Sequence, residues 1–219
     1  MKDPFTGKEG TWFRFWGRVG WVRTSKKIVQ FARDAGSFQP RNVGNGNVAG
    51  LEIELRKHLG FIAPALSNLF FQTNLTFTKS VIEMSETEYQ SKLANARENE
   101  TVKDTRAMAG QAPYILNGGL IYSSESGFEA GAFYNVQGRT LQFAGIVDRP
   151  DVYTVPFHSL NLTVNKTFGS SDQSRIGLKV TNLLNDRRES VFSSYEATDQ
   201  LFQSLAPGRQ ISVNFSYSL

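Results

Sequence analysis

Residues 209–219 read R-Q-I-S-V-N-F-S-Y-S-L, and every second residue from Ile211 to Leu219 is apolar. Because the side chains of a β-strand alternate between its two faces, this pattern predicts a strand with one apolar and one polar face. The length of the segment also matches the ~9–11 residues with which a tilted strand crosses a bilayer. A half-buried strand of a soluble β-sandwich would show the same pattern, so the rest of the chain has to decide between the two.

The composition of the chain is that of one domain of ordinary size. It has 219 residues, of which 40% are hydrophobic, and a formal net charge of +4 that is spread along the sequence. No apolar run approaches the ~18 residues of a membrane helix. The first ten residues lack the pattern of a secretory signal, so we expect either a cytoplasmic protein or a piece of a longer chain. The absence of cysteine excludes disulfides, zinc–thiolate sites and cysteine nucleophiles.

The alternation of apolar and polar residues recurs in six further segments. In one of them Leu51, Ile53 and Leu55 alternate with charged residues, and in another Phe71, Leu75 and Phe77 alternate with polar ones. The sequence therefore predicts seven antiparallel strands in all. We expect them at residues 48–56, 70–81, 114–123, 128–137, 157–168, 175–184 and 209–219.

The connections between these strands alternate strictly between short and long. Residues 60–68, 124–127 and 169–174 form short connections, whereas residues 82–113, 138–156 and 185–208 form long ones. If consecutive strands run up and down, all long connections lie at one end of the sheet. Outer-membrane barrels have this asymmetry, whereas sandwiches mix loop lengths at both ends. We expect the long connections to be polar, irregular loops, except for a short helix over residues 89–97 that follows a capping box at residues 85–88.

The charged residues of the expected strands also favour a membrane barrel. On the apolar faces, charges occur only near strand ends, as at Lys57 and Lys79. A Lys or Arg that faces lipid at mid-bilayer costs ~2–4 kcal/mol, while charges that face the lumen are tolerated. The middles of the opposite faces do carry charges, namely Glu52, Glu54, Glu129 and Lys179.

Two tyrosines on one face are spaced like the aromatic girdles of such a barrel. Tyr114 and Tyr122 are separated by ~20 Å of height on a tilted strand, close to the ~25 Å between girdles. The sequence thus predicts an all-β fold, an antiparallel up-and-down transmembrane β-barrel of which about seven strands are present. Residues 47–219 would form these strands, and residues 1–46 the end of an upstream barrel strand followed by a long loop.

Four motifs between residues 39 and 219 occur in a characteristic order. Residues 42–55 contain Asn-x-Gly followed by Gly-x-Glu, residues 106–122 carry a Pro…Asn…Tyr strand, and residues 178–186 contain Asn-Leu-x-Asn before the final strand at residues 207–219. In this order and spacing they resemble the C-terminal barrel region of a TonB-dependent outer-membrane receptor. Residues 5–38 match no part of the family's pattern.

The resemblance implies energised uptake of a scarce ligand, such as a siderophore, cobalamin or a glycan, across the outer membrane. In this family the TonB complex acts through a plug domain, and residues 1–219 contain no such domain. The family's barrel has about 22 strands, is surrounded by outer-membrane lipid, and is recognised by the barrel-assembly machinery through its C-terminal strand. Seven strands would leave open edges in lipid, so we expect a C-terminal fragment of a receptor.

The resemblance also implies where the ligand binds. In the family the plug and the extracellular loops bind it, so the candidates here are residues 82–113, 138–156 and 185–208, with no individual residue assigned. The leading alternative is a soluble all-β carbohydrate-binding module, whose apolar strand faces would pack against a second sheet. A third hypothesis, an outer-membrane barrel enzyme, lacks a nucleophile–base constellation in the sequence.

No other motif in the sequence predicts a catalytic, cofactor or metal site, and we expect no enzyme activity. His58 and His158 have no second ligand at metal spacing. Glu52 and Glu54 could act as an acid–base pair, but we interpret them as charges that line the lumen. Tryptophans interleaved with arginines in residues 12–23 could stack single-stranded nucleic acid, but we interpret this segment as a strand or as an aromatic belt at a membrane surface. No basic groove recurs later in the sequence, so we expect no nucleic-acid partner.

Overall fold

The computed structural model describes residues 12–20, 27–31, 38–42, 45–169 and 173–218. Antiparallel strands dominate these residues, and α1 (Glu86–Ala94) is the one α-helix among them. This confirms the expected all-β class. No helix in the described part of the chain is long and apolar enough to span a membrane.

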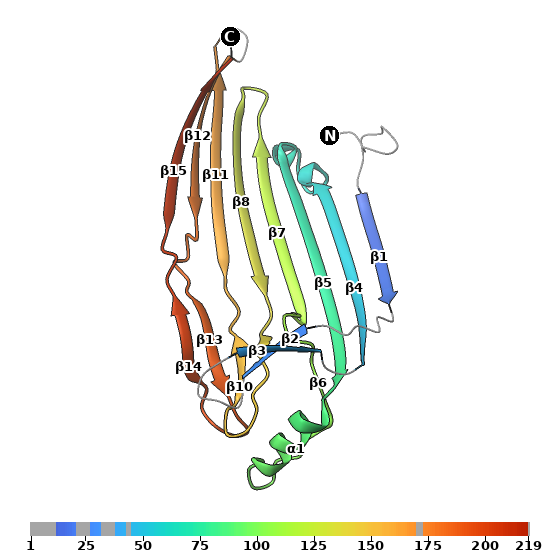
Figure 1. Cartoon of the computed structure of the whole chain (residues 1–219). Helices are drawn as coiled ribbons and strands as arrows, with labels where there is room; N and C mark the ends of the chain where they lie inside the picture. Colours follow the sequence, from blue (N-terminus) through green and yellow to red (C-terminus); the bar gives the residue numbers. More distant parts are fainter. Residues whose placement is uncertain (1–11, 21–26, 32–37, 43–44, 170–172, 219) are drawn as a thin grey trace.

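The largest sheet has nine strands, eight of which follow the order β1-β4-β5-β7-β8-β11-β12-β15 (Figure 1). Each strand of this series pairs antiparallel with the next, and the short β6 (Thr105–Arg106) pairs with the end of β5. The strands therefore run up and down, as expected. Their bounds are Trp12–Gly20 (β1), Gly46–His58 (β4), Leu69–Glu83 (β5), Tyr114–Ser123 (β7), Phe128–Gln137 (β8), Ser159–Phe168 (β11), Ser174–Thr181 (β12) and Gln210–Tyr217 (β15).

The seven expected strands are all present, and two of them, β7 and β8, have the expected bounds. The strand expected at residues 175–184 ends earlier, at Thr181, because Asn182 takes a φ of 52° and Asn185 a φ of 57°. Asparagine tolerates this left-handed conformation, which no strand can continue through. The series of eight strands has one member more than the seven expected, since β1 pairs with β4 along its full length.

The register aligns the apolar residues of neighbouring strands on one continuous face. Leu75 lies opposite Ile53 on one side and opposite Leu116 on the other. The same alignment continues to the last strand, where Leu178 lies between Val164 and Val213. We call this surface the apolar face, and much of it is exposed. Its exposed members include Leu51, Phe77, Tyr114, Leu120, Phe128, Val164, Ile176, Leu178, Ile211, Val213, Phe215 and Tyr217.

The opposite face of the sheet, here the polar face, is joined by hydrogen bonds between side chains. Asn74 donates to Glu52 at 2.7 Å, and Asn135 donates to Asn117. The arrangement leaves little room at Gly177, where a Cβ atom would lie 2.2 Å from Oδ1 of Asn214. Amide side chains of neighbouring strands thus approach one another across this glycine.

The connections confirm the expected asymmetry of the sheet. Figure 1 shows all the short connections at one end and all the long ones at the other. The short connection after β4 holds two 3₁₀ turns, Leu59–Phe61 and Pro64–Leu66. We call the opposite end of the sheet the loop end.

Two of the long connections are not irregular, which corrects the prediction made from the sequence for residues 138–156 and 185–208. They form a second, four-stranded sheet in the order β14-β13-β10-β9. Its strands pack a small core in which Val152 is fully buried against Ile146, Phe143, Phe192 and Phe202. Four to six residues are too few for the period-two alternation to be recognised. The bounds are Thr140–Phe143 (β9), Asp151–Thr154 (β10), Arg188–Ser193 (β13) and Gln200–Leu205 (β14).

The buried apolar side chains of the described residues gather at or near the loop end. They are Ile82, Met108, Val136, Leu141, Ala144, Ile146 and Val152. The middle of the main sheet contributes none of them. The best-packed part of the described chain is therefore formed by the long connections.

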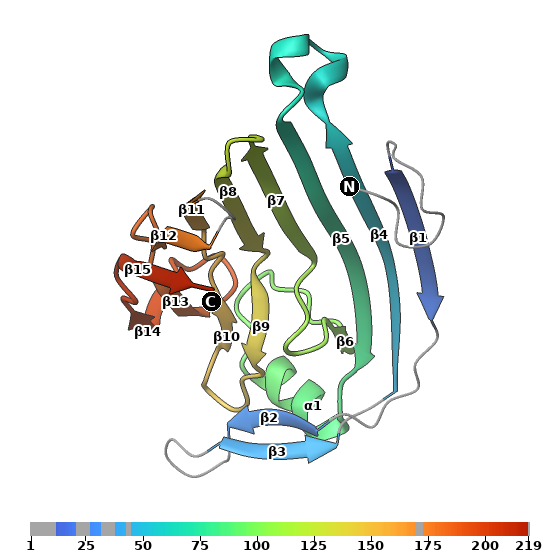
Figure 2. The ribbon, with the colours of Figure 1, turned by 90° about the horizontal axis from the view of Figure 1, so that it is seen from above.

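The first 46 residues contain more structure than the expected strand end and loop. Besides β1, they form a hairpin of β2 (Lys27–Phe31) and β3 (Phe38–Asn42) in the connection that leads to β4. Figure 2 shows the main sheet curving from β1 at one edge to β15 at the other. Within the described residues β1 pairs only with β4 and β15 only with β12, so the strands do not form a closed barrel.

Candidate functional site

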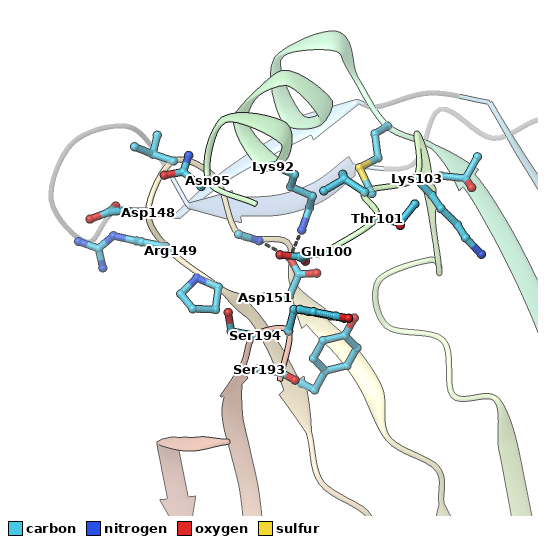
Figure 3. Close-up of a pocket in the computed structure, with 18 residues that line it drawn as sticks. Lys92, Asn95, Glu100, Thr101, Lys103, Asp148, Arg149, Asp151, Ser193 and Ser194 are labelled. Atoms are coloured by element: carbon cyan, nitrogen blue, oxygen red, sulfur yellow. Dashed lines mark hydrogen bonds and ion pairs between the residues drawn. The ribbon is translucent and has the colours of Figure 1, made fainter. Parts of the chain in front are cut away.

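The three long connections expected to bind a ligand meet around one pocket of about 470 Å³ at the loop end, here the loop pocket (Figure 3). The first connection supplies residues 84–105, the second residues 145–153, and the third residues 193–195. Sequence reasoning identified the connections but none of the individual residues. Ten of the lining residues are polar or charged and labelled in the figure: Lys92, Asn95, Glu100, Thr101, Lys103, Asp148, Arg149, Asp151, Ser193 and Ser194.

Helix α1 forms one wall of the loop pocket and begins with the expected capping residue. Ser85 is the N-cap, and its Oγ accepts a hydrogen bond from the backbone N–H of Glu88 at 3.3 Å. The helix spans Glu86–Ala94 rather than the expected 89–97, because it starts directly after this cap. Glu86 and Glu88 in the first turn and Lys92 in the last turn complement the helix dipole.

A buried ion pair anchors α1 to the main sheet. Glu88 and Arg106 form two hydrogen bonds, at 2.5 and 3.2 Å, and their side chains are 0% and 6% exposed. Arg106 belongs to β6, which pairs with the end of β5. The bidentate geometry fixes both the position and the rotation of the helix.

A second ion pair joins the first two connections inside the loop pocket. Lys92 donates from Nζ to Oδ1 of Asp151 at 2.7 Å, and the backbone N–H of Gly145 donates to the same oxygen at 2.8 Å. Figure 3 shows these contacts near the centre of the pocket. Both charged side chains are largely buried, so the pair holds α1 against the start of β10.

The rim of the loop pocket contains a strained backbone position. Val147 has a φ of 62°, which is costly for a β-branched residue. Its N–H donates to Oγ of Ser91 in α1 at 2.5 Å, which helps to hold the conformation. The next two residues, Asp148 and Arg149, are exposed, and Figure 3 shows their charged ends pointing outward, away from the Lys92–Asp151 pair. Strain of this kind is typical of binding and catalytic sites.

Tyr153 of β10 also lines the loop pocket, and its hydroxyl stays protonated at ordinary pH. Burial raises its pKa from 10.0 to about 12, and the Asp151 carboxylate adds to the effect, against the opposing charges of Arg139 and Arg106. The Arg139 guanidinium lies 5.0 Å from the ring centre of Tyr153. Arg139 also donates to Asp199 at 2.6 Å and lowers the pKa of that carboxyl.

We predict that Tyr153 makes the stability of the folded chain sensitive to alkaline pH. Because folding raises the pKa of Tyr153, its stabilising contribution is fully present below pH 10 and is lost as the pH rises from 10 to about 12. Thermal unfolding at several pH values should show this loss. Tyr153→Phe should reduce it, and a variant whose stability falls as steeply as that of the wild type would contradict the assignment.

The residues singled out from the sequence lie elsewhere. His58 ends β4 at the short-connection end, where its ring stacks edge-on against Phe70 at 5.0 Å. His158 precedes β11, and a 2.6 Å hydrogen bond joins its Nδ1 and the hydroxyl of Tyr134. The two histidines are thus at opposite ends of the sheet. Among the residues that the structure describes, no cluster of three or more His, Cys, Asp or Glu could hold a metal ion.

The same-face carboxylates Glu52 and Glu54 lie on the polar face and are engaged by neighbours. Glu52 accepts the hydrogen bond from Asn74, and Glu54 forms an ion pair with Arg56 at 2.7 Å. A smaller hollow of about 260 Å³ adjoins Glu54 and is lined by amide side chains of β5, β7, β8 and β11. Both carboxylates have the polar surroundings expected of charges on this face.

Comparisons of the chain with protein-family models, curated proteins and solved structures gave no match. The resemblance to TonB-dependent receptors therefore rests on the motifs of the sequence alone. The pattern of strands and the loop pocket have to carry any functional assignment.

Proposed function

We propose that this chain is the C-terminal barrel region of a TonB-dependent outer-membrane receptor, and that its loop pocket is part of the ligand site. In this proposal the strands of the main sheet cross the outer membrane, the apolar face meets lipid, and the polar face meets the lumen. Such a receptor takes up a small molecule or a glycan, with energy supplied by the TonB complex through a plug domain. It binds and transports, and catalyses no reaction.

The observation that carries the proposal is the exposed, continuous apolar face of an up-and-down sheet. Leu120 and Leu178, in the middle of their strands, are 40% and 41% exposed. Ile211 of the last strand is 70% exposed. A soluble sheet buries such a face against a second layer, and monomeric proteins seldom expose large apolar patches. Contact with lipid would explain why apolar residues are exposed along the whole face.

The difference between the two ends of the main sheet supports the same proposal. The packed core, the second sheet and helix α1 all lie with the long connections, while the opposite end carries short turns. Outer-membrane barrels combine long, structured loops on the outside with short periplasmic turns. The open edges of β1 and β15 are where further strands of a larger barrel would pair.

The soluble carbohydrate-binding module is disfavoured by the same face. That alternative requires a second sheet over the apolar residues, and the four-stranded sheet of the described chain packs its core at the loop end instead. A monodisperse monomer in buffer without detergent would nevertheless contradict our proposal and restore this alternative.

Labelling of single cysteines on intact cells tests the proposed topology. Cysteine introduced at Asn95, Asp148 or Ser194 in the long connections should react with an impermeant thiol reagent, because these residues would lie outside the cell. Cysteine at Ser126 or Gln173 in the short turns should react only after lysis. The chain has no native cysteine that could react. The experiment needs a Gram-negative host that exports the complete receptor, and reversed labelling would refute the assignment.

A further inference from the structure

The loop pocket has a chemistry that narrows the class of its ligand. Its lining includes three cationic and three carboxylate side chains, namely Lys92, Lys103, Arg149, Glu100, Asp148 and Asp151. One of each, Lys92 and Asp151, neutralise each other at 2.7 Å inside the pocket. The charges of the lining therefore balance. A strongly anionic or cationic ligand would need an excess of the opposite charge.

Most of the remaining lining groups can both donate and accept hydrogen bonds. Thr101, Ser193, Ser194 and Tyr153 offer hydroxyls, and Asn95 offers an amide. The carboxylates of Asp148 and Glu100 are acceptors on the same lining, and the ammonium of Lys103 is a donor. A ligand rich in hydroxyl groups matches such a mixture, because each hydroxyl donates once and accepts twice.

Two tyrosine rings belong to the apolar part of the loop pocket, together with Met84, Val102, Val147 and Pro150. Tyr153 is a neutral phenol whose ring contacts Arg139, and Tyr195 is 37% exposed on the opposite connection. An exposed aromatic ring gives a flat apolar surface for the C–H groups of a sugar ring, while its hydroxyl can bond to the sugar. The volume of about 470 Å³ lies within the ~300–1,000 Å³ of small-molecule sites.

We infer that the loop pocket binds a neutral oligosaccharide, in which a sugar ring stacks on Tyr195 and its hydroxyls bond to Asp148 and Ser194. This inference rests on the proposed receptor function, since it names the ligand class of that receptor's external site. Balanced charges disfavour anionic ferric chelates, and a lining made mostly of polar and charged residues disfavours a corrin. The strained turn at Val147 positions Asp148 at the rim, where it meets the ligand first.

Calorimetric titration of the full chain in detergent micelles tests the inference. The probes are neutral trisaccharides with maltose-, cellobiose-, xylose- and mannose-type linkages, together with trigalacturonate, triglycine, an anionic ferric tricatecholate and cyanocobalamin. At least one neutral trisaccharide should bind, and the other four probes should bind at least about tenfold more weakly. Preferred binding of the anionic sugar, the peptide, the chelate or the corrin would overturn the inference, as would no binding of any neutral trisaccharide.

Variants of the rim locate the binding to the loop pocket. Asp148→Asn and Tyr195→Ala should each weaken saccharide binding about tenfold, because each removes a contact to the sugar. Glu125→Gln, a matched change in the turn between β7 and β8 at the other end of the sheet, should leave binding unchanged. Equal binding by all three variants would overturn the inference. Unchanged thermal unfolding of each variant shows that a loss of binding is not a loss of folding.

The two proposals fail in distinguishable ways. A chain that is a monomer in plain buffer but binds a trisaccharide through Asp148 contradicts the receptor and supports the alternative module. A chain with the proposed labelling pattern that binds no neutral trisaccharide keeps the receptor and loses the saccharide.

Discussion

Leu75→Arg is expected to abolish insertion of the complete receptor into phospholipid bilayers, whereas Thr76→Arg should insert nearly as well as the wild type. The two positions are neighbours on β5, at the middle of the main sheet. Leu75 lies on the apolar face between Ile53 and Leu116, and an arginine there would meet lipid at a cost of ~2–4 kcal/mol. Thr76 lies on the polar face directly opposite Glu52, whose carboxylate can pair with an introduced guanidinium.

Refolding of the complete receptor into phospholipid vesicles measures this difference. The inserted fraction is read from protection against protease and from heat-modifiable migration on gels, for the two variants and the wild type side by side. Equal damage from both substitutions would contradict the assignment of faces, because a register shifted by one residue exchanges them. If neither substitution lowered the inserted fraction, the sheet would not be in contact with lipid.

Glu88→Ala should release helix α1 from the main sheet. The substitution leaves the guanidinium of Arg106, only 6% exposed, without its carboxylate. Breaking a buried ion pair by removal of one partner costs about 3–5 kcal/mol. Hydrogen exchange in residues 86–106 should accelerate strongly, while the strands of the main sheet keep their protection. Exchange at the wild-type rate would show that the pair does not hold the helix.

Two control variants separate the ion pair from a general loss of stability. Asp199→Ala removes the partner of Arg139 in an exposed pair, where each side chain is more than a third exposed, and should have little effect. The double variant Glu88→Leu, Arg106→Leu should recover most of the protection, since a well-packed apolar pair often replaces a buried ion pair without loss. If the double variant were as damaged as Glu88→Ala, the unpaired charge would not be the cause.

The long strands could be predicted from the sequence because their alternation extends over many residues. In residues 128–137 every second residue from Phe128 to Val136 is apolar, and β8 has those bounds. For residues 12–23 a strand was only one of two interpretations, because Trp12 and Trp16 break the separation into apolar and polar faces, although Phe13, Phe15 and Val19 alternate with arginines. The short strands of the second sheet offered too few residues for any period to emerge.

The sequence predicted at which end of the sheet the loop pocket lies, but it did not predict which residues line the pocket. That the long connections share one end follows from the up-and-down order of the strands. The contacts inside the pocket join residues far apart in sequence, such as Lys92 and Asp151, which are 59 positions apart. No local pattern encodes such a pair. The sequence also could not show what covers the apolar face. A strand that faces lipid and a strand that packs against a second sheet both have alternating apolar residues.

Each long connection leaves one strand of the main sheet and returns on the next, which gives the loop pocket a modular character. A connection can be exchanged with that of a relative while its two flanking strands keep their register, so recognition can diversify one hairpin at a time. The Glu88–Arg106 pair lies within a single connection and would travel with it. The Lys92–Asp151 pair spans two, so a graft of either connection has to supply its matching charge at position 92 or 151.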